Sequence, residues 1–232
     1  MAWCAQHDPG GPTIPKTLNP EHKAWMKKVD DTLSLAYEID LRAQGITPRR
    51  VTRGFLSGYP FPIPDFEFGV RIETKPRRLP MFLPLGFAYA IPQQIIDLIE
   101  AIEPGVHRYW PIDMTWEDGT AVAEKRWILN VCNRLDTLLP EVSQDMWVTK
   151  PPVGEGDYVI TARFFGLEKT DLAQRRANPP SLFGSKDRID GHAIWLEYRE
   201  GPGNIYFSDP FVAALLPLGI SGIELTYSLR EI

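Results

Sequence analysis

Residues 205–227 read IYFSDPFVAALLPLGISGIELTY, and this stretch decides the fold. Its first three residues are apolar and typical of a short strand. Ser208 is a favourable N-cap residue and Pro210 suits the first helical turn, so a helix is predicted to begin here. Gly219 predicts the end of that helix, and residues 222–227 predict a second strand. The order is therefore strand, capped helix, glycine, strand.

The same order of elements occurs earlier in the chain, near residues 86–112. Pro92 to Glu103 is predicted to be its helix, because apolar residues form a wide stripe at helical spacing and Pro104-Gly105 ends the run. The stripe consists of Ile95, Ile96, Leu98, Ile99 and Ile102. Two such units with hairpins between them predict an α+β fold, with helices packed on a mainly antiparallel or mixed sheet. The chain has 22 prolines, about twice the average frequency, which predicts a loop-rich protein.

Strands are predicted on both sides of a tight turn at Asp118-Gly119, a dipeptide typical of hairpins. They are the stretches from Val106 to Ile112 and from Arg126 to Val131. Two further strands are predicted from Tyr158 to Phe165 and from His192 to Tyr198.

The N-terminal part of the chain gives a less regular pattern. Residues 1–18 are interpreted as an extended arm, and Asn19-Pro20-Glu21 predicts a helix start. After Tyr37 either a strand follows or the helix continues to Gly45, and the pattern leaves both open. Phe66 to Ile72 is the best strand candidate of an otherwise proline-broken region. We expect one globular domain over residues 1–232, made of the arm, an N-terminal variable part at 19–84 and a part at 85–228 that carries the family resemblance described below.

Composition and charge exclude several classes of protein. No apolar stretch approaches the length of a membrane span, and the first residues lack the pattern of a signal peptide, so we expect a cytoplasmic protein with no membrane partner. The net charge is −5 and the basic residues are scattered, which makes nucleic acid an unlikely partner and permits a basic one. The two cysteines, Cys4 and Cys132, form no metal motif, and no cofactor is expected.

A search for catalytic groups finds no complete set. His192 opens an apolar strand, and Asp190 is the only acid near it in the sequence. His107 lies beside Arg108, and Cys132 has apolar neighbours typical of a core thiol. Each is interpreted first as a structural residue. An enzyme with a site assembled from distant residues, including His192, remains the alternative.

Several segments together resemble a bacterial family of immunity proteins from polymorphic toxin systems, once catalogued as a domain of unknown function. The resemblance covers roughly residues 85–228 and is carried by residues 106–112, 126–138, 191–195, 205–209 and 218–225. It implies a protein that binds and neutralises a cognate secreted toxin by stoichiometric inhibition, without catalysis. It also implies that the toxin is encoded by an adjacent gene. The toxin's identity and the oligomeric state are left open, as is a structural or regulatory role.

The predicted hairpin offers one candidate surface for such a partner. Asp113, Trp116, Glu117 and Asp118 cluster there, with Glu124 on its far side. An acidic loop with an exposed aromatic ring could enter the basic cleft of a toxin that acts on nucleic acids or nucleotides. The simpler interpretation is a solvated turn, in which the Trp116 ring has no evident burial.

Overall fold

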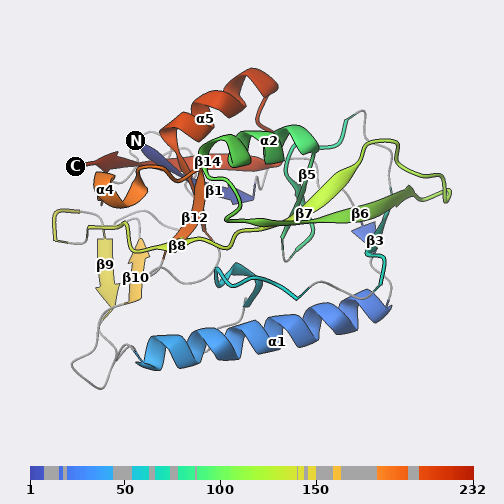
Figure 1. Cartoon of the computed structure of the whole chain (residues 1–232), viewed down its shortest axis with the longest axis horizontal. Helices are drawn as coiled ribbons and strands as arrows, with labels where there is room; N and C mark the ends of the chain where they lie inside the picture. Colours follow the sequence, from blue (N-terminus) through green and yellow to red (C-terminus); the bar gives the residue numbers. More distant parts are fainter. Residues whose placement is uncertain are drawn as a thin grey trace, which may run out of the picture.

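Two six-stranded sheets form the framework of the protein in the computed structural model (Figure 1). The structure describes residues 1–7, 16–17, 20–43, 54–62, 66–73, 78–86, 88–139, 141–143, 146–149, 159–162, 182–197 and 204–232. Both sheets contain parallel and antiparallel pairs, and helices pack on them, so the α+β class with mixed sheets is confirmed.

The first sheet joins the two ends of the chain. Its order is β11 (Leu182–Gly184), β14 (Ile223–Glu231), β1 (Ala2–His7), β13 (Ile205–Ser208), β12 (Ile194–Glu197) and β8 (Arg134–Leu135). The outer pairs β11–β14 and β12–β8 are parallel, and the inner pairs are antiparallel.

The interpretation of residues 1–18 as an arm is wrong for its first part. Ala2–His7 is an inner strand, held between β13 and β14, and Ala2 and Cys4 are fully buried. The sequence did not reveal this because both partner strands lie some 200 positions away, and pairing at that separation leaves no local pattern. Of residues 8–18, only the short strand β2 (Lys16–Thr17) lies within the described residues.

The second sheet contains the predicted hairpin. Its order is β2, β3 (Gly69–Ile72), β6 (Arg108–Trp116), β7 (Arg126–Asn130), β5 (Tyr89–Ile91) and β4 (Leu83–Pro84). β6 and β7 pair antiparallel, with Ile112 opposite Arg126. β6 continues four residues past its predicted end because its second half pairs with β3 on the other side. β9 (Met146–Thr149) and β10 (Val159–Ala162) form a separate antiparallel pair. β10 lies within the strand predicted at 158–165.

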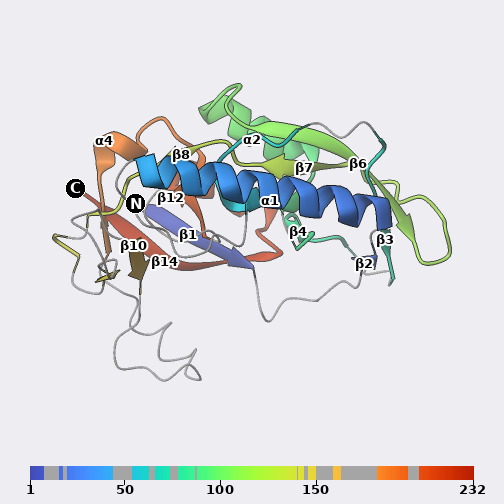
Figure 2. The same cartoon turned by 90° about the horizontal axis from the view of Figure 1, so that it is seen from below.

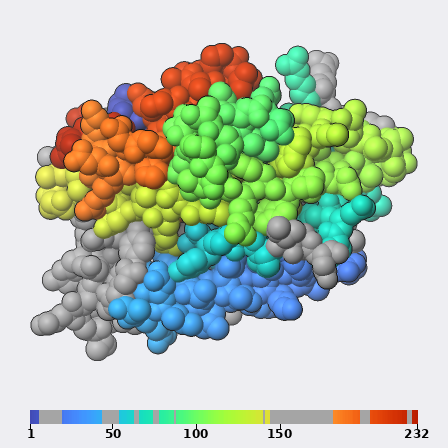
Figure 3. All heavy atoms as spheres, in the orientation of Figure 1, coloured from blue at the N-terminus to red at the C-terminus, as the bar shows by residue number. Residues whose placement is uncertain are grey.

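Helices cover the second sheet on two sides (Figure 1). α2 (Gln93–Ile102) lies above it, while α5 (Asp209–Leu215) packs beside α2 on β13 and β1 of the first sheet. Figure 3 shows the side chains of the two helices in contact. α1 (Pro20–Ala43) runs along the opposite side, as Figure 2 shows from below. The short elements are η1 (Gly54–Leu56), α4 (Lys186–Ile189) and η2 (Leu216–Leu218).

The predicted helices are present, with one difference in detail at Ser208. α2 confirms the helix at 92–103, and β13, α5 and β14 confirm the order deduced for 205–227. After Tyr37 the chain stays helical to Ala43 and forms no strand. Ser208 occupies the N-cap position of α5, but its hydroxyl makes no capping hydrogen bond and is buried with no hydrogen-bond partner among the described residues.

Apolar side chains from these layers form three clusters. The largest lies between α2, α5 and the two sheets and contains Ile95, Ile99 and Phe211, all fully buried. A second lies between the second sheet and α1, where Val29 and Leu33 pack. A third occupies the other face of the first sheet around Trp195 and Tyr206. Burial of this apolar surface is the main stabilising contribution to the fold.

A backbone contact joins the two sheets beside β14. The Phe82 amide donates to Ser221 O at 3.0 Å, and the Met81 amide donates to Ser221 Oγ. Gly222 follows with φ +87°, and a Cβ placed on it would lie 2.0 Å from Phe82 O. Glycine is therefore required here for both its conformation and its size.

Candidate functional site

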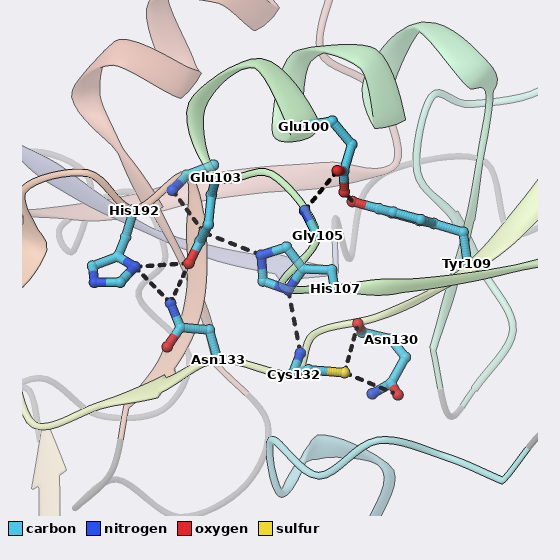
Figure 4. A network of polar contacts seen from close by, with 10 residues as sticks. Glu100, Glu103, Gly105, His107, Tyr109, Asn130, Cys132, Asn133 and His192 are labelled. Atoms are coloured by element: carbon cyan, nitrogen blue, oxygen red, sulfur yellow. Dashed lines mark hydrogen bonds and ion pairs between the residues drawn. The ribbon is translucent and has the colours of Figure 1, made fainter.

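Side chains from three other parts of the chain converge on Glu103, at the C-terminal end of α2 (Figure 4). Its backbone N–H donates to Ile99 O and closes the last helical turn, while its side chain is only 3% exposed. The carboxylate therefore lies where α2, the start of β6, the β7–β8 connection and the turn before β12 meet. A buried charge at such a junction needs hydrogen-bonding partners to be tolerated.

Four donors satisfy this carboxylate. Oε1 accepts from Asn133 Nδ2 at 2.5 Å and from His192 Nδ1 at 2.7 Å. Oε2 accepts from His107 Nε2 at 3.1 Å and from the Ala193 amide at 3.0 Å. Asn133 Nδ2 also lies 2.8 Å from His192 Nδ1, because both nitrogens face the same oxygen. Each oxygen is thus held by two hydrogen bonds.

These hydrogen bonds decide the charge of Glu103. Burial alone raises the pKa of the carboxyl group, because it disfavours the ionised form. The hydrogen bonds from His107, His192 and the Ala193 amide outweigh burial and lower the pKa to about 2. Glu103 is therefore a carboxylate throughout the physiological range, and it accepts hydrogen bonds only.

His107 is a structural member of this network. Its side chain is buried, and its Nδ1 accepts a hydrogen bond from the Cys132 amide at 3.2 Å. The ring proton is accordingly on Nε2, which donates to Glu103. His107 thus ties the β7–β8 connection to the end of α2.

Cys132 is not arranged as a nucleophile. Its amide, and not its thiol, faces His107, while Sγ lies 3.3 Å from Asn130 Oδ1 (Figure 4). Burial is the main cause that raises the pKa of the thiol to about 11, against a smaller opposing influence of Arg108. A neutral thiol with no base beside it is a poor nucleophile.

His192 differs from His107 because part of its ring reaches the surface. Its side chain is 31% exposed, whereas Glu103 beneath it is almost fully buried. The sequence offered Asp190 as its only acidic neighbour, but the acid that it contacts is Glu103, 89 positions away. Glu103 and Asn133 were both missed by sequence reasoning. The only available signal for Glu103 was a carboxylate at the end of an apolar helix, and such residues are common.

The hairpin residues lie at the opposite end of β6 from this network. Asp113 and Glu117 are exposed, whereas Trp116 is half-buried. The expectation that the Trp116 ring lacks burial is wrong, because the ring packs against the cluster of apolar residues between the second sheet and α1. Trp116 pairs with Ile72 of β3, and this neighbouring strand supplies the cover that the sequence did not predict.

The remaining acids of the hairpin have local partners. Asp118 Oδ1 accepts from the Thr120 amide and hydroxyl at 3.0 and 2.6 Å, and Gly119 has φ +82°. Asp118 and Gly119 therefore build the predicted turn. Glu124 forms a 2.8 Å ion pair with the buried guanidinium of Arg126, which also donates to the carbonyl of Pro80. Asp113 and Glu117 are the hairpin acids that keep exposed side chains with no partner among the described residues.

Two further properties of the described residues bear on the site. None of their helices has the length and apolar character needed to cross a membrane. None of their histidine, cysteine, aspartate and glutamate side chains gather into a group of three or more that could hold a metal ion.

Comparison with known proteins identifies one family. No curated protein sequence matches the chain. The model of the immunity protein family Imm11 matches residues 17–226 and so includes α1 and the other elements at 19–84 that sequence reasoning had treated as variable. Since this match covers most of the chain, the protein belongs to the Imm11 family of immunity proteins.

Proposed function

We propose that the protein neutralises a cognate bacterial toxin by binding its toxic domain in one-to-one stoichiometry in the cytoplasm of the producing cell. The family match over residues 17–226 carries this proposal. We further propose that an adjacent gene encodes the toxin, as the organisation of polymorphic toxin systems implies. Inhibition by binding needs a stable complementary surface and no reacting groups.

The chemistry around Glu103 supports a binding role. Its carboxylate is saturated by four donors, and the nearby thiol of Cys132 is neutral and directed toward Asn130. The network joins four parts of the fold, so its direct effect is to hold the surface in one conformation. A rigid surface binds with a smaller loss of conformational entropy.

We propose the β6–β7 hairpin as one toxin-contact surface, formed by Asp113, Trp116, Glu117 and Asp118. Glu117 supplies an exposed negative charge, and the exposed edge of Trp116 supplies apolar area. Asp118 holds the turn that presents them. The net charge of −5 favours association with a basic cleft.

Co-expression with the toxic domain encoded by the adjacent gene tests this function. Rescue of growth together with co-purification of the two proteins is the expected result. A titration of toxin activity then separates inhibition from catalysis, because an inhibitor reaches its end point at one equivalent. Protection by a small fraction of an equivalent would refute stoichiometric inhibition.

One observation favours a second candidate, an enzyme that acts on the toxin or its product. A carboxylate that orients a partly exposed imidazole is the arrangement of a general base, and Glu103 and His192 form such a pair. This function predicts that a folded His192 variant still binds the toxin and fails to protect. Retained protection by such a variant would exclude it.

A further inference from the structure

The Glu103–His192 pair fixes the orientation of a ring whose side chain is 31% exposed. Nδ1 of His192 must carry the ring proton, because it lies 2.7 Å from a carboxylate that can only accept. In a neutral ring Nε2 is then a lone-pair acceptor. No described residue forms a hydrogen bond with Nε2.

The orientation of this ring is fixed by neighbours from several elements. Glu103 cannot rotate, because His107, Asn133 and the Ala193 amide hold both of its oxygens. Ala193 directly follows His192, so the same carboxylate holds both the ring and the backbone beside it (Figure 4). An acceptor oriented in this way binds a donor without first losing rotamer freedom.

The charge beneath the ring determines which donor fits. Among the described residues, no lysine or arginine pairs with Glu103, and its only ion-pair partners are the two histidines. The carboxylate of Glu103 therefore places a negative charge directly behind the His192 ring. Asp190, two positions earlier in the sequence, is a further exposed carboxylate on the same turn. A cationic group that donates a hydrogen bond satisfies both the lone pair of Nε2 and this charge.

From this geometry we propose that His192 is a toxin-contact residue whose Nε2 accepts a hydrogen bond from a lysine or arginine side chain of the toxin, with Glu103 as its positioning residue. The proposal rests on the proposed function. It names a second contact, separate from the β6–β7 hairpin, and it concerns binding and not proton transfer.

The state of the ring can be tested without the toxin. Correlation of ¹⁵N and ¹H resonances of the histidine rings distinguishes the two neutral tautomers. The expected spectrum of His192 shows a protonated Nδ1 and an unprotonated Nε2. A His192 ring that carries a proton on Nε2, as the other neutral tautomer or as an imidazolium, would overturn the proposal, because no acceptor would then face the partner.

The contact itself is tested with His192→Asn. The asparagine amide can replace Nδ1 as a donor to Glu103, but nothing in it replaces Nε2. We expect an unchanged urea-unfolding midpoint and an affinity for the inactivated toxin domain that is lower by about tenfold or more, as for loss of a hydrogen bond to a charged group. Asp97→Asn, an exposed substitution on α2, is the matched control and should leave the affinity unchanged.

The outcomes separate this inference from the proposed function. Wild-type affinity of His192→Asn together with full protection overturns the contact and leaves the proposed function intact. If His192→Asn binds the toxin domain with wild-type affinity but no longer protects, the proposed contact is wrong and the enzyme is favoured. If the wild-type protein neither binds the toxin domain nor protects against it, the contact and the proposed function both fail.

Discussion

Replacement of Glu103 by glutamine tests the role of the buried network most severely. The substitution preserves the shape of the side chain but removes its charge and replaces one acceptor oxygen by an NH2 group. Each oxygen of Glu103 receives two hydrogen bonds. The NH2 group of the glutamine would replace one of these oxygens, and its N–H donors would then face two other N–H donors. Buried donors without acceptors are costly.

The pKa of Glu103 gives the magnitude. Its fall from 4.5 to about 2 corresponds to about 3 kcal/mol of stability at neutral pH, since a tenfold change in proton affinity is about 1.4 kcal/mol. Because the pKa is lower in the folded state, this contribution is complete above pH 4.5 and is lost as the pH falls toward 2. Glu103→Gln should therefore be less stable than wild type by at least about 3 kcal/mol at pH 7.

Urea unfolding followed by tryptophan fluorescence measures this difference. The gap between wild type and Glu103→Gln should narrow by about 2 kcal/mol between pH 7 and pH 3. Over this range the unfolded wild-type chain takes up a proton at residue 103 while the folded protein keeps its carboxylate, and a glutamine does not titrate. Glu117→Gln makes the same chemical change at an exposed site and should stay within about 0.5 kcal/mol of wild type. The assigned role of Glu103 is refuted if Glu103→Gln lies within about 1 kcal/mol of wild type at pH 7 with a parallel pH profile.

Three further substitutions test the fold and the proposed hairpin contact. Gly222→Ala should cost at least about 3 kcal/mol in urea unfolding, because its Cβ would meet Phe82 O, whereas Gly105→Ala, with open space at φ +72°, should cost only about 1 kcal/mol. Equal losses would disprove the close approach. Ile99→Ala should cost about 2–5 kcal/mol by emptying a fully buried position, and a loss well below 1 kcal/mol would contradict its burial. Glu117→Lys should slow association with the toxin domain and reduce its salt dependence in surface plasmon resonance, and unchanged rates would remove the hairpin from the interface.

The elements that the sequence predicted are those with a local signal. α2 has an apolar stripe bounded by proline and glycine, and the turn at Asp118-Gly119 is built by the side chain of Asp118 and the positive φ of Gly119. Residues 205–227 likewise contain their own strand, helix and turn residues. In each case short-range geometry decides the structure, and a single sequence contains that information.

The features that the sequence did not predict depend on distant contacts. β1 is a strand because β13 and β14 flank it, and Trp116 is half-buried because β3 lies beside β6. The network at Glu103 joins residues up to 90 positions apart. Neither the structural propensities of residues nor the periodicity of apolar residues in the sequence reveals such long-range contacts. His192 was therefore considered as a candidate, while the acid that orients it was not found.

The most direct test of toxin neutralisation by binding is a titration of toxin activity in vitro with purified protein, at toxin concentrations well above the dissociation constant. Residual activity should fall linearly and reach zero at one equivalent, and the mixture should elute as a complex of the two proteins. Complete loss of toxin activity at a small fraction of an equivalent, or full activity with an excess of folded protein, would contradict the account.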